Sequence, residues 1–145
     1  MSIGENVAAN LPYLRRYARA LTGSQQTGDA FVRATLEAAL ADDDLKASLE
    51  GGRVPLYRAF NKVWSSAYLE VADQGAEGAD LPGDVEADRL QNVTPLNRQA
   101  LLLTTLEDFT IEQSSEIMEI PAEEVEKMVQ DAIAEIDRES ATSVL

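Results

Sequence analysis

The chain has 145 residues, no cysteine and no histidine, with 26 acidic against 12 basic side chains. This composition excludes disulfides, thiolate chemistry, Cys/His metal sites and imidazole acid–base catalysis. No apolar run approaches the roughly 20 residues that a membrane helix needs, and residues 1–10 lack the basic and apolar regions of a signal peptide. We therefore expect a soluble, cytoplasmic bacterial protein that needs no cofactor and no metal.

The excess acidic charge lies in the second half of the chain. Up to Ala72 there are eight basic and eight acidic residues, whereas after Ala72 there are four basic and eighteen acidic residues. An anionic segment repels the phosphate backbone of nucleic acids. The second half is therefore expected to avoid DNA and to favour a cationic protein partner.

Helical patterning over residues 1–72 predicts a first domain, a bundle of three helices. The first helix is expected from residue 10 to residue 23, with Pro12 in its first turn. The second, over residues 27–41, carries a buried stripe that includes Phe31, Ala34 and Ala38. The third begins at Pro55 and ends near Val71, and the Asp- and Gly-rich segment before it predicts a solvated loop.

Residues 73–90 are rich in Gly, Asp, Glu and Ala and predict an acidic linker between two domains. The second domain, residues 91–139, is expected to begin with a helix at Thr94 and Pro95. Thr110 and Gln113 then have the spacing of a capping box before a short helix. A longer helix opens at Pro121, which completes a helix-turn-helix pattern. Residues 140–145 are expected to form a non-helical tail.

Three stretches together resemble extracytoplasmic-function sigma factors. Residues 11–40, which contain LPYLRRYARALTG and GDAFVRATLEAAL, resemble the second conserved region of that family. Residues 53–68 resemble the following helix, with Asn61 where those proteins often carry asparagine. Residues 93–136 are similar to their fourth region, although Val93 stands where that pattern begins with Leu. The resemblance implies an all-α chain with a sigma2-like and a sigma4-like domain.

The chain departs from this family where sigma factors contact DNA. A recognition helix needs basic or neutral polar side chains, but residues 121–139 contain seven acidic and two basic residues. The arginines that usually follow Asn61 and help to open promoter DNA are missing. Glu119 also occupies a turn position that favours glycine, where a positive φ costs other residues roughly 1 kcal/mol. DNA reading by this chain is therefore not expected.

A sigma-like body without DNA-reading residues resembles the sigma-factor-like domain of the PhyR family, response regulators of the alphaproteobacterial general stress response. The resemblance implies partner switching. A phosphorylated receiver domain frees the sigma-like domain, which captures the small anti-sigma factor NepR and so releases the true sigma factor. Residues 140–145 would then be the start of the receiver, which would also be an intramolecular partner.

The resemblance also implies that the anti-sigma factor lies between the two domains, bound through amphipathic helices of its own. Apolar residues at helical spacing are more often core than interface, and a basic run on an amphipathic helix is more often a solvated face. With these alternatives open, the residues predicted to contact the partner are Leu14, Arg16, Tyr17, Leu106, Asp108, Phe109, Glu124, Met128 and Asp131.

Two other functions remain as alternatives. A divergent but authentic sigma factor would bind core RNA polymerase and promoter DNA, and the acidic last helix is the feature that distinguishes the two cases. An enzyme that uses paired carboxylates is the third alternative, but no spacing in the sequence supports it. The acidic face of the last helix serves either solubility or the binding of basic partner residues.

Overall fold

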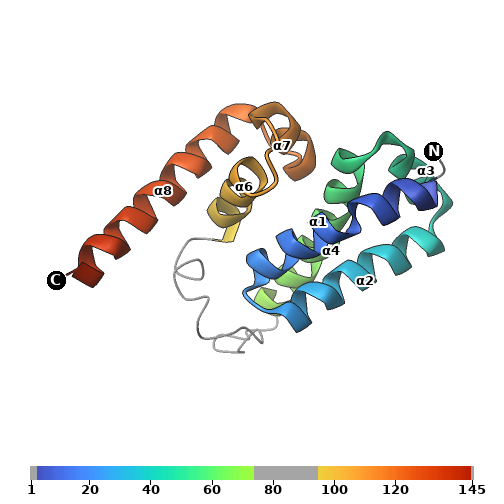
Figure 1. The fold of residues 1–145 in the computed structure, drawn as a ribbon, viewed down its shortest axis with the longest axis horizontal. Coiled ribbons are helices and arrows are strands. Elements are labelled where there is room, and N and C mark those ends of the chain that lie inside the picture. Colours follow the sequence, from blue (N-terminus) through green and yellow to red (C-terminus); the bar gives the residue numbers. More distant parts are fainter. Residues whose placement is uncertain (1–2, 74–94, 145) are drawn as a thin grey trace.

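The computed structural model describes residues 3–73 and 95–144, with the side chains of residues 3–67 and 95–138 (Figure 1). All regular structure in these ranges is helical, which confirms the all-α prediction. The first half contains α1 (Ile3–Thr22), α2 (Gln25–Ala41), α3 (Asp43–Ser48), the 3₁₀ turn η1 (Leu49–Gly51) and α4 (Arg53–Asp73). The second half contains α6 (Pro95–Thr105), α7 (Ile111–Met118) and α8 (Ala122–Val144). None of the helices described is long and apolar enough to cross a membrane.

Helix α1 begins seven residues earlier than the sequence predicted, so Pro12 lies inside the helix and not in its first turn. The physical reason is tertiary packing. Ile3, Val7 and Leu11 are spaced by four residues and pack against the core from one face of the helix. Burial of this face stabilises the turns before Pro12, whose side chain is exposed.

The Asp- and Gly-rich segment between α2 and α4 is not the predicted loop, because it contains α3 and η1. The Asp42 carboxylate caps α3 by accepting hydrogen bonds from the backbone N–H groups of Asp44 and Leu45. The buried Leu49 then anchors the segment to the core. The acidic residues therefore start a helix here, as aspartate often does at an N-cap.

The end of α8 also differs from the prediction. The helix continues through residues 140–144, which had been predicted as a non-helical tail. No glycine or proline follows Pro121, so the sequence contains no residue that would stop the helix. The predicted linker, apart from its first residue, and the predicted cap Thr94 lie outside the described residues.

Two predicted features at the helix-turn-helix are confirmed. Thr110 and Gln113 form the capping box of α7, each side chain accepting a hydrogen bond from the other residue's backbone N–H. Glu119 ends α7 in the left-handed conformation, with φ of 57° and ψ of 42°. The turn is therefore built as the sequence indicated, with glutamate where glycine would be less strained.

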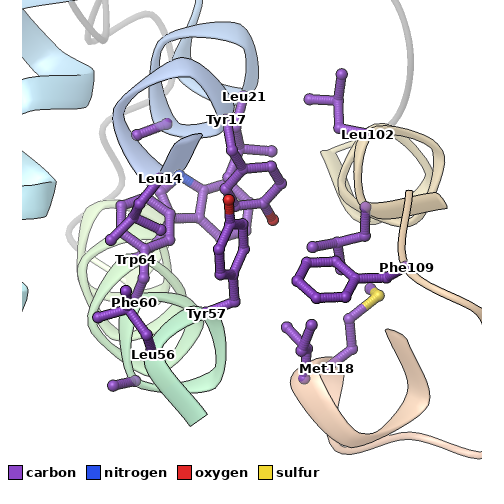
Figure 2. Close-up of a cluster of buried hydrophobic side chains, with 14 of the residues drawn as sticks. Leu14, Tyr17, Leu21, Leu56, Tyr57, Phe60, Trp64, Leu102, Phe109 and Met118 are labelled. Carbon is purple, nitrogen blue, oxygen red and sulfur yellow. The ribbon is translucent and has the colours of Figure 1, made fainter. Parts of the chain in front are cut away.

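The two halves share one hydrophobic core. The cluster of buried side chains includes Leu14 and Phe60 from the first half, and Leu103 and Ile117 from the second. Figure 2 shows Phe109 and Met118 of the second half facing Tyr57 of the first. The main contacts between the halves are those of α1 with α6 and of α4 with α7. The described halves are therefore packed directly against each other.

Helices α1 and α2 are in close contact at Gly28. The sequence predicted a buried stripe with Phe31, Ala34 and Ala38, but these side chains are only half-buried. The buried residues of α2 lie one position further along the chain, at Val32, Thr35 and Ala39, in line with Gly28. A Cβ atom at Gly28 would lie 2.7 Å from the backbone N of Arg19 and 2.8 Å from the carbonyl carbon of Ala18. Backbone atoms cannot yield as a flexible side chain can, so only glycine fits at this crossing.

We predict that Gly28→Ala lowers the free energy of unfolding by about 1–3 kcal/mol, since the extra methyl group forces the two helices apart. Urea denaturation followed by circular dichroism measures the change. The matched control is Gly4→Ala, an exposed position in the first turn of α1, which is expected to be neutral or stabilising by up to about 1 kcal/mol. Equal effects at the two positions would contradict the packing argument.

A second prediction concerns the two fully buried tyrosines, Tyr17 and Tyr57. Burial raises the pKa of both phenols above the ordinary value of about 10. They stay neutral in the folded chain while the unfolded chain ionises, so their contribution to stability is complete below about pH 10 and is lost as the pH rises. Each buried phenol should lower the free energy of unfolding by up to about 1.4 kcal/mol for each pH unit above about pH 10.

Urea denaturation between about pH 9 and pH 11 tests this dependence. The double variant Tyr17→Phe with Tyr57→Phe should lose less stability over this range than the unchanged chain. Tyr13→Phe is the matched control, because Tyr13 is 47% exposed. A pH profile of the double variant that parallels the unchanged chain would show that the buried phenols are not responsible.

Candidate partner-binding surface

A buried carboxylate connects the two halves of the molecule. Glu107 lies in the turn after α6, and its side chain is completely buried. Nε and Nη2 of Arg16, on α1, donate to Glu107 Oε2 at 3.0 and 2.8 Å. On α4, Tyr57 Oη donates to Glu107 Oε1, and Arg53 Nη2 lies 3.5 Å from the same oxygen. A buried carboxylate is tolerated only when it is paired in this way.

Aromatic rings surround this carboxylate on the side of α4. The guanidinium of Arg53 lies over the ring of Phe109, 4.4 Å from the ring centroid. Phe109 meets Tyr57 edge to face, with the centroids 4.9 Å apart. Cation–π and edge-to-face contacts of this kind each add about 0.5–1.5 kcal/mol to simple burial. We call Arg16, Arg53, Tyr57, Glu107 and Phe109 together the Glu107 junction.

Polar contacts on either side of the Glu107 junction join the halves further. Arg98 Nη1 on α6 donates to the carbonyl oxygen of Leu21 at 2.7 Å. Asn61 Nδ2 on α4 donates to the carbonyl oxygen of Ile117 on α7 at 3.3 Å. The exposed Lys62 also forms an ion pair with Glu119 at 3.2 Å. The interface between the halves is therefore a mixture of apolar packing and directional polar bonds.

Three of the predicted contact residues are buried. Leu14 and Tyr17 have no exposed surface, and Phe109 is 5% exposed. Tyr17 packs against the rings of Tyr57 and Phe60, with centroid distances of 5.3 and 5.7 Å. In this conformation these side chains contact other parts of the chain. Their contact with a partner stays a prediction.

Three other predicted residues lie together at the edge of the Glu107 junction. Arg16 Nη2 donates to the carbonyl oxygen of Leu106 at 3.2 Å, as well as binding Glu107. Leu106 is half-buried, whereas Asp108 is exposed and has a positive φ of 62°. The structure thus brings Arg16 and Leu106 together across 90 residues of sequence.

The remaining predicted residues share one face of α8. Glu124, Met128 and Asp131 are spaced by four and three residues, which places them in line along a helix. Glu124 and Asp131 are exposed, and Met128 is half-buried. This face combines negative charge with a flexible apolar side chain, a combination suited to an adaptable protein interface.

Nothing in the sequence indicates that Glu107, Arg53 and Tyr57 belong to one site. Glu107 comes just after a largely apolar helix, and its partners lie 50 to 91 residues away. A charged residue that ends an apolar helix is usually solvated. Only the packing of the halves shows that this carboxylate is buried.

Two families cover most of the chain. The family described as the Sigma2 domain of PhyR matches residues 7–61, and the family described as Response regulator PhyR, sigma-like domain, matches residues 90–139. The Phyllosphere-induced regulator PhyR of Methylorubrum extorquens is 39% identical over all 145 residues of this chain. The chain spans 53% of that regulator, so it corresponds to about half of its relative.

Two solved structures are similar over 95% of this chain. The complex of PhyRSL with NepR from Sphingomonas sp. Fr1 has 43% sequence identity and a TM-score of 0.71, and this chain covers 88% of its matched chain. The complex of the anti-anti-sigma factor PhyR with the anti-sigma factor NepR from Bartonella quintana has 32% identity and a TM-score of 0.72, with 50% of its chain covered. Together with the two docked sigma-like halves, these matches show that the chain belongs to the PhyR family.

Proposed function

We propose that this chain is an anti-anti-sigma factor of the bacterial cytoplasm. It binds a small anti-sigma factor of the NepR type through a sigma-like surface and thereby releases a sigma factor. The observation that carries the proposal is the combination of two docked sigma-like halves with an acidic helix in the position of the DNA-reading helix. A protein that only imitates a sigma factor needs the two docked sigma-like halves but does not need a basic α8.

The electrostatics of α8 argue against promoter recognition. Glu123 and Glu124 lie exposed in its first turn, and Glu126 is exposed one residue beyond the buried Val125. These are the positions that a recognition helix presents to bases and phosphates. Each contact with a phosphate normally gains from the release of counterions, whereas carboxylates at these positions are repelled.

The same charges favour a protein partner with basic side chains. Glu124 and Asp131 flank Met128 on one face of α8, so one carboxylate lies on each side of an apolar side chain. An amphipathic helix with lysine or arginine beside its apolar stripe fits such a face. We place the second-half contact of the anti-sigma factor here.

Control by a receiver domain is also part of the proposal. The PhyR relative in Methylorubrum extorquens is almost twice as long as this chain, and it is named a regulator. In the full-length protein a receiver would occupy or release the sigma-like surface according to its phosphorylation. Access to the surface, and not its chemistry, would then be the regulated step.

The test is isothermal titration of the chain with the NepR-type anti-sigma factor from the same genome, beside a promoter-binding assay. We expect a one-to-one complex and no promoter binding. Glu124→Ala with Asp131→Ala should weaken the complex roughly tenfold, equivalent to about 1.4 kcal/mol. The matched control is Glu126→Ala with Asp137→Ala, which removes the same charge from the opposite flank of α8. This control should bind as the unchanged chain does.

Failure to bind the anti-sigma factor would refute the proposal. A divergent sigma factor is the other outcome that this experiment detects. In that case the chain, or its variant with alanine at Glu123, Glu124 and Glu126, would support promoter-dependent transcription with core RNA polymerase.

A further inference from the structure

We propose that Glu107 is the positioning residue of the partner-binding surface. Its carboxylate fixes the orientation of the two halves, so that side chains from both form one surface for the anti-sigma factor. This inference rests on the proposed function. It assigns Glu107 no contact with the partner, because the side chain is completely buried.

The geometry of the bonds is what fixes an orientation. Two nitrogen atoms of Arg16 bind the same carboxylate oxygen, and Tyr57 and Arg53 approach the other. One oxygen of the carboxylate is therefore bonded by α1 and the other by α4. Charge-assisted bonds are strongly directional, whereas the burial of apolar surface is non-directional. Rotation of the second half would break several of these bonds together.

A role in fixing the relative orientation of the two halves explains the polar residues of the Glu107 junction better than a role in stabilising the fold. Replacing a buried ion pair with apolar residues of similar size is often neutral or stabilising, so a buried carboxylate is weak evidence for stability. Its best-attested role is to select one register among several. Here the register is that of α6 and α7 against α1 and α4.

The proposed surface needs such a register because its parts lie on different halves. Arg16 and the exposed Tyr13 come from α1, whereas Leu106 and Asp108 follow α6 in the second half. The Tyr13 ring lies under the guanidiniums of Arg16 and Arg53, with centroid distances of 5.3 and 5.8 Å. The Glu107 junction thus continues directly into exposed side chains of both halves.

The solved complexes of relatives contain both halves as well. The two NepR complexes match 95% of this chain, and therefore include both of its halves, at TM-scores of 0.71 and 0.72. Both halves are therefore part of the fold that this chain shares with relatives solved together with NepR.

The experiment starts from two substitutions, each titrated with the NepR-type anti-sigma factor. Glu107→Met keeps the volume of the side chain but removes every side-chain bond of Glu107 to the first half, and we expect affinity to fall about tenfold or more. Glu107→Gln keeps hydrogen-bonding capacity without the charge and should lose less. Circular dichroism should show the same helix content for all three chains, because each half keeps its own packing.

A covalent link between the halves separates orientation from other effects. The chain has no cysteine, so new cysteines can be labelled without background. Lys62 and Glu119 form an exposed ion pair between α4 and the end of α7. Joining Lys62→Cys and Glu119→Cys with a short bismaleimide should restore the affinity of Glu107→Met to within about threefold of the linked chain with Glu107 intact.

The matched control is a link within the first half. Arg19 and Asp29 form a partly exposed ion pair between α1 and α2, with Nε and Oδ1 2.9 Å apart. Linking Arg19→Cys to Asp29→Cys should not rescue Glu107→Met, since it does not constrain the second half.

Two results would overturn the inference while leaving the proposed function intact. One is wild-type affinity in Glu107→Met, and the other is a folded, linked Glu107→Met chain that still binds weakly. If the unchanged chain does not bind the anti-sigma factor at all, the proposed function itself fails. The titration of the unchanged chain therefore distinguishes the two kinds of failure.

Discussion

The structure depends on one buried carboxylate that belongs to the second half and is bonded entirely by the first. Arg16, Arg53 and Tyr57 surround Glu107, and around this point the apolar residues of both halves merge into one core. A carboxylate without these partners would cost several kcal/mol to bury. The halves therefore dock where it is neutralised, and the relative positions of α6, α7 and α8 follow from that docking.

Local features of the fold were readable in the sequence, and long-range pairings were not. The capping box at Thr110 and the strained turn at Glu119 were predicted because a few neighbouring residues determine them. The start of α1 was misjudged because contacts with distant residues, and not local signals, extend the helix past Pro12. Of the predicted site, Glu124 and Asp131 are exposed as a contact requires, whereas Leu14 and Tyr17 are buried between helices. Periodicity marks an apolar face but does not say whether another helix covers it.

Charge is what separates this chain from the sigma factors it resembles. Its helix-turn-helix keeps the cap, the turn and the second helix, yet that helix is acidic where a DNA-binding protein needs positive or neutral side chains. An anti-sigma factor recognises the shape and side chains of a sigma factor and makes no use of its affinity for phosphate. An acidic α8 is therefore compatible with imitation of a sigma factor and unfavourable for promoter binding.

The central claim is that the chain displaces a sigma factor by occupying its inhibitor. The most direct measurement starts from a purified complex of the anti-sigma factor with its sigma factor, adds the chain stepwise, and follows free sigma factor by native gel and by transcription with core polymerase. The account predicts that sigma factor is released in proportion to the chain added, and that transcription rises with it. A complex that stays intact in excess chain, or transcription that the chain supports without the sigma factor, would contradict the account.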